Sequence, residues 1–255
     1  MSFPQWADVA ADIGLDAIDG SILFFRNHTP VYLKNIGDEL RKRGISITML
    51  TTYPDFTHPD PMQRQREMDY CIRDIALASE LQARYLRITA GQKRDYLDTQ
   101  EMARQVADCF SVCEQKAKEY GIGLVYENHG RPGVWQEYDF TYNPKAFLAL
   151  THNLRESSVM VNFDTANTVA YGADPVPVFQ EVFSRVETIH VADTIAYGTF
   201  QHVAIGTGKA PIQEILSIAK RKGFNGWLCI EEGSGNGVEG IRQAVKTVRQ
   251  MWTQA

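Results

Sequence analysis

Four residues with ionisable side chains stand at the ends of four apolar runs in the second half of the chain. They are Glu127, Asp164, His190 and Glu231. Successive members lie roughly 25 to 40 residues apart, the length that a parallel strand takes with its return helix and loops. One ionisable residue at the carboxyl end of each strand is the arrangement of a TIM-barrel active site.

The four side chains share a chemistry that suits a divalent metal ion. Three carboxylates and one imidazole form a hard, mostly oxygen ligand set, which favours Mn²⁺ or Mg²⁺ and tolerates Co²⁺ or Zn²⁺. The alternative is that they are ordinary polar residues where strands meet solvent. That alternative readily explains one such residue, but it is a poor explanation for four that all stand at corresponding strand ends.

Strand and helix patterns alternate along almost the whole chain and predict the elements that would position these residues. We expect strands over residues 15–19, 45–50 and 85–89, and further strands ending at residues 127, 164, 190 and 231. We expect helices over 5–13, 31–43, 62–81, 99–120, 144–153, 176–184, 212–222 and 238–252. The strand segments are nearly continuous apolar runs, as in a parallel sheet with both faces buried.

Glycine and proline positions support these boundaries. Glycines follow four of the expected helices, where a left-handed cap is needed: Gly14, Gly44, Gly121 and Gly223. Prolines stand near three expected helix starts, where a missing N–H costs little: Pro144, Pro175 and Pro211.

The predicted fold class is α/β, a (β/α)8 TIM barrel whose first strand is missing from this chain. The pattern contains seven strands, and no room for another precedes Phe3. Either the barrel is open there, or another segment or a partner subunit fills the position, or the chain is a shortened form. No linker divides the sequence, so we expect a single domain over residues 1–255.

Composition excludes several classes of function. The chain has 255 residues, 44% hydrophobic content and a net charge of −5. It therefore lacks the excess of basic residues that is typical of nucleic-acid-binding proteins, and its charge is more compatible with a small polar substrate. No apolar stretch reaches the ~18 residues of a membrane span, and the N-terminus lacks the pattern of a signal peptide. The four cysteines form no CxxC pair, and we expect reduced core thiols in a cytoplasmic protein: Cys71, Cys109, Cys113 and Cys229.

The chain resembles the xylose-isomerase-like TIM-barrel superfamily, which includes sugar isomerases, ketose 3-epimerases, inosose dehydratase and endonuclease IV, the AP endonuclease family 2 fold. The segments that carry the resemblance are LDAID (15–19), YENH (126–129), FDTAN (163–167), HVAD (190–193), IGTG (205–208) and IE (230–231). No single motif is decisive, but their order and spacing together are specific and cover nearly the whole chain.

The resemblance implies one divalent metal held by Glu127, Asp164, His190 and Glu231, with Mn²⁺ or Mg²⁺ expected. It also makes Glu127 and Glu231 the acid-base pair on opposite faces of a bound ketose. One would remove an α-proton to give a metal-stabilised enediolate, and the other would return a proton. The implied protein is a sugar isomerase or epimerase with a small-molecule substrate, and dimers or tetramers are common among its relatives.

Four further residues receive expected roles. His129 shares a face with Glu127 and could bind a substrate hydroxyl, or it is a locally bonded loop histidine. Asn167 suits hydroxyl groups of a substrate. His202 lies where the family often contacts substrate, and the alternative is a solvated loop residue. Asp193 could support the ligand histidine through a hydrogen bond, or it is a polar loop residue.

A multi-zinc phosphodiesterase site is excluded by the same comparison. Asn167 stands where endonuclease IV has a zinc-binding histidine, and an amide is a poor zinc ligand. The ends of the strands at 45–50 and 85–89 also lack histidine, and the chain has six histidines in all.

Two other functions stay open at this point. A lyase, a dehydratase or decarboxylase acting on an oxidised sugar or cyclitol, would use the same metal and the same proton abstraction. A non-enzymatic or nucleic-acid-binding barrel is disfavoured by the acidic balance and by the complete ligand set. Two aromatic residues in the loop after His129, Trp135 and Tyr138, could form a lid or a wall on which a sugar stacks. The alternative is that they pack over the mouth of the barrel or at a subunit contact.

Overall fold

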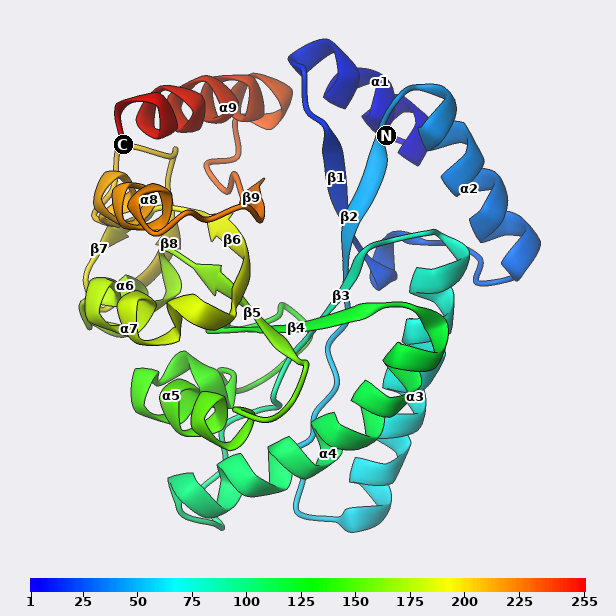
Figure 1. Ribbon diagram of the computed structural model, residues 1–255, viewed down its shortest axis with the longest axis vertical. Helices are drawn as coiled ribbons and strands as arrows, with labels where there is room; N and C mark the ends of the chain where they lie inside the picture. The colour runs from blue at the N-terminus through cyan, green and yellow to red at the C-terminus, as the bar shows by residue number, and fades with distance from the viewer. The chain divides into compact units, whose positions relative to one another are not determined.

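The computed structural model describes residues 1–255 (Figure 1). The chain forms two compact units. The first unit comprises Met1–Tyr126 and Asn153–Met160, and the second comprises Glu127–His152 and Val161–Ala255. Each unit is described by itself below.

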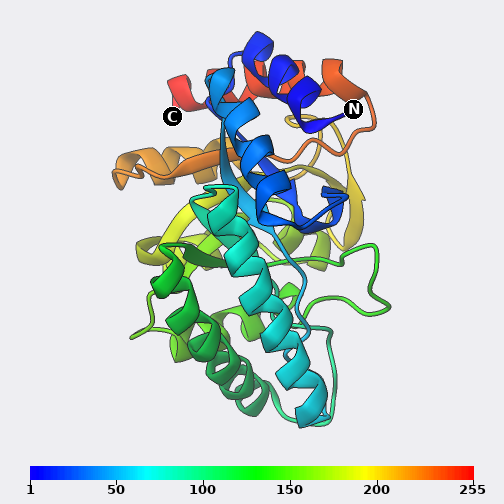
Figure 2. The same cartoon turned by 90° about the vertical axis from the view of Figure 1, so that its right-hand side faces the viewer.

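The first unit is built from parallel strands alternating with helices. Its strands are β1 (Ala17–Ser21), β2 (Ser46–Thr51), β3 (Tyr85–Ile88) and β4 (Gly123–Glu127), and they pair in parallel in that sequence. Its helices are α1 (Phe3–Ile13), α2 (Pro30–Lys42), α3 (Pro61–Glu80) and α4 (Thr99–Tyr120), with a 3-10 turn η1 (Ile22–Phe24). The long helices α3 and α4 lie side by side (Figure 2).

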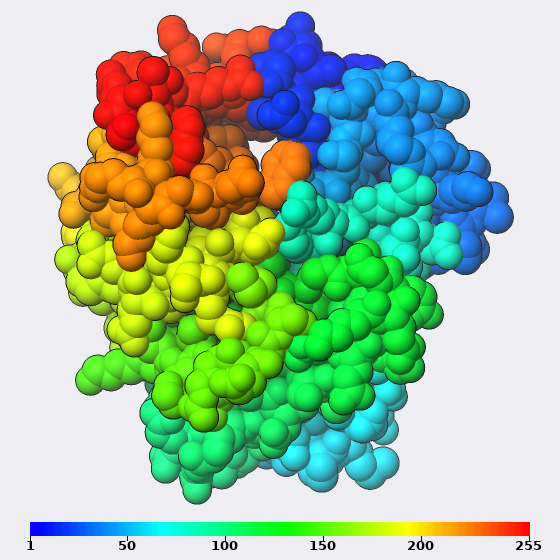
Figure 3. Space-filling view, in the orientation of Figure 1, coloured from blue at the N-terminus to red at the C-terminus, as the bar shows by residue number.

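The second unit continues the alternation and adds a hairpin. Its strands β5 (Met160–Asp164), β6 (Val186–Val191) and β9 (Trp227–Ile230) pair in parallel, and β7 (Thr194–Ala196) pairs antiparallel with β8 (Thr199–His202). Its helices are α5 (Pro144–Asn153), α6 (Asn167–Tyr171), α7 (Pro175–Val182), α8 (Ile212–Arg221) and α9 (Gly237–Gln254), with 3-10 turns η2 (Phe140–Tyr142) and η3 (Phe183–Arg185). Helices α8 and α9, orange and red in the space-filling view, lie beside each other (Figure 3).

The expected class, α/β with seven parallel strands, is confirmed. The parallel strands run in the order β1-β2-β3-β4 within the first unit and β5-β6-β9 within the second, so in each unit they follow the order of the chain. The expected helices and strands all form, with ends within a few residues of those predicted. The hairpin of β7 and β8 and the short helix α6 were not expected, because each is too short to show a clear period in the sequence.

The glycines and prolines at the helix ends lie where the sequence predicts them. The four capping glycines have φ angles of 78°, 71°, 69° and 78° in chain order, the left-handed region that favours glycine: Gly14, Gly44, Gly121 and Gly223. Pro144 and Pro175 are the first residues of α5 and α7, and Pro211 is the N-cap of α8.

Each unit has its own aromatic core. In the first, Phe110 packs edge-on against Phe56 and Tyr126, with ring centroids 5.7 and 5.8 Å apart, and all three rings are buried. In the second, a row of rings runs from α5 through β5 to α7 and η3, and contains Phe147, Phe163, Phe179 and Phe183. Burial of such side chains, at roughly 25 cal/mol per Å², is the main stabilising contribution of each core.

Three of the four cysteine thiols lie in the core as predicted. Cys71, Cys109 and Cys113 are buried, Cys229 is half-buried, and none forms a disulfide. Hydrogen bonding to Cys113, together with burial, raises the pKa of Cys71 well above its usual value, and burial raises the pKa of Cys109 to about 11. Cys71 and Cys109 are therefore protonated at neutral pH and behave as small apolar groups. None of the helices combines the length and the apolar character that crossing a membrane requires.

Glu114 on α4 holds the turn at residues 154–158 within the first unit. Its carboxylate accepts hydrogen bonds from the Ser157 hydroxyl and the Ser158 backbone N–H, both at 2.8 Å, and pairs with Lys118 at 2.7 Å. Burial alone would raise the pKa of Glu114, but the ammonium group and the hydrogen bonds outweigh it and hold the pKa at about 2. The ionised form therefore stabilises the fold.

Glu114→Gln is expected to lower the free energy of unfolding at pH 7 by roughly 1–3 kcal/mol, because the ion pair with Lys118 and the charge-assisted hydrogen bonds of Glu114 are lost. Since the folded pKa lies below the unfolded one, this stabilisation is complete above the unfolded value and disappears as the pH falls through about 2. Urea titrations at pH 7 and pH 3 should show the difference between variant and parent shrinking in acid. Glu119→Gln on the same helix is the control, because the Glu119 side chain is 59% exposed and its pairing with Lys116 is a surface contact. A difference that does not depend on pH would contradict the role of the charge.

Candidate metal centre

The four residues singled out in the sequence come together in the second unit. Glu127 is the last residue of β4, Asp164 the last of β5, His190 lies on β6, and Glu231 directly follows β9. One ligand atom of each lies within 4.8 Å of those of the others. Parallel strands bring their carboxyl ends to one edge of a sheet, so residues distant in sequence gather there.

One nitrogen of the His190 imidazole lies close to two of the carboxylates. Its Nδ1 is 2.9 Å from Oε2 of Glu231 and 3.5 Å from Oε1 of Glu127. Two ligands at right angles on a cation with bonds of ~2.1 Å are separated by about 3 Å. The spacing of these atoms therefore matches that of ligands around one small divalent ion.

The electrostatics of the cluster are those of crowded carboxylates in a buried place. Glu127 and Asp164 are 1% and 0% exposed, whereas the Glu231 side chain is 46% exposed. Burial, together with the charges of Glu231 and Glu127, raises the pKa of Asp164 well above its usual value. Burial would also raise the pKa of Glu231, but the hydrogen bond and charge of His190 outweigh it and lower the pKa of that carboxyl.

Asp164 provides the test of whether a metal fits here. Its Oδ1 accepts the backbone N–H groups of Ala166 at 2.8 Å and Asn167 at 2.6 Å, while its Oδ2 is buried with no hydrogen-bond partner. A buried carboxylate oxygen without a donor is costly unless a cation satisfies it. The donor set and this oxygen both fit a divalent cation such as Mn²⁺ or Mg²⁺.

Asn128 fixes the spacing between two of the candidate ligands. The buried amide accepts the N–H of Asp164 at 2.8 Å and donates to the carbonyl oxygen of Asp164 at 2.9 Å and to the hydroxyl of Thr168 at 3.2 Å. Because Asn128 directly follows Glu127, this clamp fixes the backbone of Asp164 beside that of Glu127 within the second unit. These partners of Asn128 lie more than 30 residues away in the chain, so the sequence alone does not show them.

Asn128→Asp is expected to lower Mn²⁺ affinity by about 10-fold and the free energy of unfolding by roughly 2 kcal/mol. The variant keeps the acceptor but replaces the donating amide with an oxygen that faces the carbonyl of Asp164. Calorimetric Mn²⁺ titration and urea unfolding give the two quantities. Asn143→Asp is the control, since Asn143 uses only its acceptor oxygen, toward the N–H of Lys145. Unchanged Mn²⁺ affinity in Asn128→Asp would show that the clamp does not position the ligands.

Two threonines tie down the backbone beside the other ligands. The Thr141 hydroxyl donates to the carbonyl oxygen of Glu127 at 2.8 Å and to Asp139 at 2.7 Å. Thr165 donates its N–H to the carbonyl of His190 at 3.0 Å and its hydroxyl to the carbonyl of Ala192 at 2.6 Å. Neither threonine stood out in the sequence, because each acts through backbone atoms that only the folded chain brings near.

Of the three residues predicted to bind substrate, Asn167 and His202 interact with a residue of this cluster. Asn167 is buried, begins α6, and is joined to Asp164 through its backbone N–H. His202 ends β8, is half-buried, and its charge contributes to lowering the pKa of Glu231. His129 is half-buried in the loop after β4. Their roles toward a substrate stay predictions.

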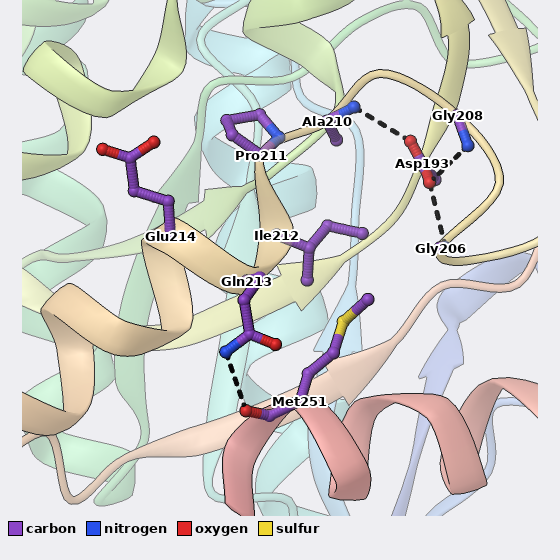
Figure 4. A pocket seen from close by; sticks show the side chains of 9 residues that line it. All are labelled: Asp193, Gly206, Gly208, Ala210, Pro211, Ile212, Gln213, Glu214 and Met251. Atoms are coloured by element: carbon purple, nitrogen blue, oxygen red, sulfur yellow. Dashed lines mark hydrogen bonds between the residues drawn. The ribbon is translucent and has the colours of Figure 1, made fainter. Parts of the chain in front are cut away.

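The carboxylate of Asp193 is hydrogen-bonded to the backbone of the loop that follows it. Its carboxylate accepts backbone N–H groups of Thr194, Gly206, Gly208 and Ala210 at 2.8–3.0 Å, three of which are drawn in Figure 4. A pocket of about 380 Å³ adjoins it, lined further by the first turn of α8 and by Met251 of α9 (Figure 4). A Cβ on Gly208 would stand 2.3 Å from Oδ1 of Asp193, which explains the glycine there. The expected support of the ligand histidine by Asp193 stays a prediction.

A cluster of aromatic side chains lies on the loops of the same unit. Tyr138 stacks on Tyr142 with centroids 4.5 Å apart, and Phe200 meets both edge-on at 5.8 and 6.1 Å. Tyr171 and His202 extend the cluster at 5.4 and 5.6 Å. The sequence had pointed to Tyr138 and not to Phe200. The only local indication of the strand that carries Phe200 is the alternation of polar and aromatic side chains over Thr199–His202, directly after Gly198.

The chain belongs to the xylose isomerase-like TIM barrel family, whose family model matches residues 7–251. The resemblance inferred from the motifs, and with it the TIM-barrel class, is therefore confirmed.

Comparison with individual proteins agrees with the family. An uncharacterized protein of Methanocaldococcus jannaschii is 26% identical over 82% of this chain and 70% of its own length. Inosose dehydratase of Clostridium beijerinckii is 22% identical over 53% of this chain, and the match spans about half, 49%, of that enzyme. The solved structure of an L-ribulose 3-epimerase superposes with a TM-score of 0.83 at 14% identity, covering 99% of this chain and 89% of that one, and shows the shared fold.

Proposed function

We propose that the chain is a divalent-metal-dependent isomerase or epimerase that acts on a small sugar or keto-polyol by α-proton abstraction. The observation that carries the proposal is the convergence of three carboxylates and one imidazole, with the Oδ2 of Asp164 buried and without a donor. Membership of a family in which named proteins include a 3-epimerase and a dehydratase supports a sugar-modifying enzyme.

The proposed ligands are Glu127, Asp164, His190 and Glu231. When bound, a divalent cation would polarise the carbonyl of the substrate and acidify the neighbouring C–H bond. Mn²⁺ or Mg²⁺ suits this mainly oxygen set, and Co²⁺ or Zn²⁺ can replace them. Asp164, held on one side by two backbone N–H groups, supplies charge to the site and takes no part in proton transfer.

Glu127 and Glu231 are the proposed acid and base, and an oxygen of each lies within 3.5 Å of Nδ1 of His190. One removes the proton next to the carbonyl, and the resulting enediolate receives a proton from the other. Return to the same carbon from the opposite face gives an epimer, whereas return to the neighbouring carbon, with a proton shift between the oxygens, gives an isomer. Glu231 is the more exposed of the two and so exchanges its proton with water more readily.

Hydroxyl groups of the substrate would be held by His129, Asn167 and His202. Asn167 offers both a donor and an acceptor, and each histidine offers one of each when neutral. A small sugar-derived molecule is the proposed partner, and a single domain over residues 1–255 and a homo-oligomer stay predictions.

The test is deuterium uptake from D₂O, followed by NMR over a panel of ketoses, keto-acids and oxidised cyclitols with Mn²⁺ or with chelator. Metal-dependent uptake with a rearranged sugar as product is the expected result. Absence of uptake on every compound in the presence of Mn²⁺ would refute proton abstraction as the function.

A lyase is the second candidate, because inosose dehydratase is among the relatives. The first step is the same, and the intermediate then expels a leaving group instead of receiving a proton. The same NMR experiment separates the two functions, since a lyase would release water or carbon dioxide and produce an unsaturated or shortened product.

A further inference from the structure

The side chain of Cys229 lies beside the imidazole of His190, within the second unit. The two residues are Cα partners in the parallel pairing of β6 with β9, so both side chains project to the same face of the sheet. The sulfur of Cys229 and a ring nitrogen of His190 lie within 4.8 Å of each other. A cation that binds His190 can therefore reach a thiol as well as carboxylates.

Exposure separates Cys229 from the other thiols of the chain. Cys71, Cys109 and Cys113 are buried, whereas Cys229 is half-buried, like the other three residues of β9. A cation from solution can approach a half-buried thiol but not the core thiols, which pack as apolar groups. The chain thus offers one sulfur ligand near the candidate metal centre and three buried thiols that serve as internal controls.

Glu231 completes a second set of ligands. It stands two residues after Cys229, the alternation that puts side chains on one face, and its Oε2 is 2.9 Å from Nδ1 of His190. Its side chain is 46% exposed, so the carboxylate has room to turn toward a cation at Cys229. Glu127 and Asp164 are 1% and 0% exposed and lack that room. A thiolate, an imidazole and a carboxylate can thus meet at one ion.

The two ligand sets differ in the cation that they favour. Three carboxylates and one imidazole suit Mn²⁺ or Mg²⁺, whereas a set that contains sulfur suits Zn²⁺ and the softer Cd²⁺. Bonds of about 2.3 Å to sulfur and about 2.1 Å to nitrogen in a tetrahedral site put these two ligand atoms about 3.6 Å apart. The sulfur of Cys229 and the nitrogen of His190 already lie within 4.8 Å, so binding a cation requires at most small side-chain movements.

We propose that Cys229, His190 and Glu231 form a second, thiophilic metal site that overlaps the four-residue centre. Zn²⁺ is the cation that this site takes, and Cd²⁺ is its spectroscopic substitute. The thiol binds as the thiolate, and its proton passes to water. Because both sites use His190 and Glu231, a cation in the second site excludes Mn²⁺ from the centre. The inference rests on the proposed function only for the four-residue centre, and it adds that Zn²⁺ inhibits the enzyme by displacing its metal.

The first test is a Cd²⁺ titration of the chelator-treated protein, followed by the ultraviolet charge-transfer absorption of a thiolate–Cd²⁺ bond. We expect this band to saturate at one Cd²⁺ per chain. Cys229→Ala should remove the band and leave Mn²⁺ affinity within twofold of the parent, and Cys229→Ser, which nearly preserves the volume, should weaken Cd²⁺ in the same way. Cys109→Ala is the matched control, because Cys109 is a buried thiol, and it should keep the band.

The second test asks whether the two sites overlap. Mn²⁺ is added to the Cd²⁺-loaded parent while the thiolate band is followed by absorption and unbound Mn²⁺ by electron paramagnetic resonance. We expect the band to disappear as Mn²⁺ binds, and one equivalent of Cd²⁺ to lower the apparent Mn²⁺ affinity at least 10-fold. His190→Ala should weaken both cations. A band that persists at saturating Mn²⁺ would show that the sites are independent and would overturn the exclusion.

The outcomes separate this inference from the proposed function, since neither test requires turnover. Absence of a thiolate band in the parent, or an undiminished band in Cys229→Ala, would overturn the thiophilic site. A Cys229-dependent band together with no solvent exchange on any sugar or keto-acid would support the site and refute proton abstraction. Mn²⁺-dependent exchange that is at least 10-fold more sensitive to Zn²⁺ in the parent than in Cys229→Ala would support both.

Discussion

Asp164→Asn is expected to lower the affinity for Mn²⁺ by at least 100-fold, about 2.7 kcal/mol. The substitution removes the charge of Oδ2, the buried oxygen without a hydrogen-bond partner. It keeps an acceptor at Oδ1 for the N–H groups of Ala166 and Asn167, so the turn after β5 should form as before. Loss of metal affinity would then come from the ligand itself and not from a disturbed strand end.

The same variant should stabilise the metal-free protein at neutral pH. Burial, with the charges of Glu231 and Glu127, raises the folded pKa of Asp164, so ionising it in the folded state costs free energy. The folded state then holds a proton that the unfolded state has lost. Stability of the metal-free parent therefore falls as pH rises from the unfolded value of about 4 toward the raised folded value. An uncharged amide removes this dependence.

Calorimetric Mn²⁺ titration and thermal unfolding between pH 5 and pH 8, with and without chelator, measure both effects. Asp174→Asn is the control, because Asp174 caps α7 through the N–H of Val176 and asparagine caps equally well. Full Mn²⁺ occupancy in Asp164→Asn would show that the ligand set is wrong. A marked loss of stability in the metal-free variant would show that the carboxylate has a structural role.

Glu127→Gln is expected to reduce solvent exchange of the substrate α-proton by about 1,000-fold, within the range for loss of an acid-base group. An amide can still offer an oxygen to a cation, so Mn²⁺ affinity should fall less than in Asp164→Asn. The side chain is 1% exposed, and the amide nearly matches the carboxylate in volume, so the fold should be retained.

Exchange is followed by NMR in D₂O with Mn²⁺ at saturating concentration, so that loss of metal does not mimic loss of the base. Glu239→Gln, on an 81% exposed side chain at the start of α9, is the control and should leave exchange unchanged. Normal exchange in metal-saturated Glu127→Gln would remove Glu127 from the base role and leave Glu231 as the base. Glu231→Gln is the direct comparison for that assignment.

Local patterns in the chain predicted most of the fold because they depend on near neighbours. Alternating apolar runs and helical periods placed the seven parallel strands, and glycines such as Gly14 and Gly121 marked helix ends through their left-handed φ angles. The two short elements, α6 and the hairpin of β7 and β8, were missed. These elements are too short for their hydrophobic residues to show a helical or strand period in the sequence. Contacts within the second unit decide their conformation.

The candidate ligands could be named from the sequence because, in a parallel sheet, residues at the carboxyl ends of different strands lie close together in space. A residue at the end of each strand lies at one edge of the sheet, so Glu127, Asp164, His190 and Glu231 followed from their places after apolar runs. Side-chain directions at that edge, and the 2.9 Å between His190 and Glu231, needed the folded structure.

The sequence by itself determined the class of fold, the family and the types of residue at the site, since these follow from period, order and side-chain chemistry. Only the tertiary structure decided which residues support that site. Asn128 fixes Asp164 beside Glu127, Asp193 gathers the backbone N–H groups of its loop, and Phe200 rests on Gly130. The contacts of Asn128 and Phe200 join segments far apart in the chain, and those of Asp193 depend on how its loop folds back, so no local pattern in the sequence predicts the partners.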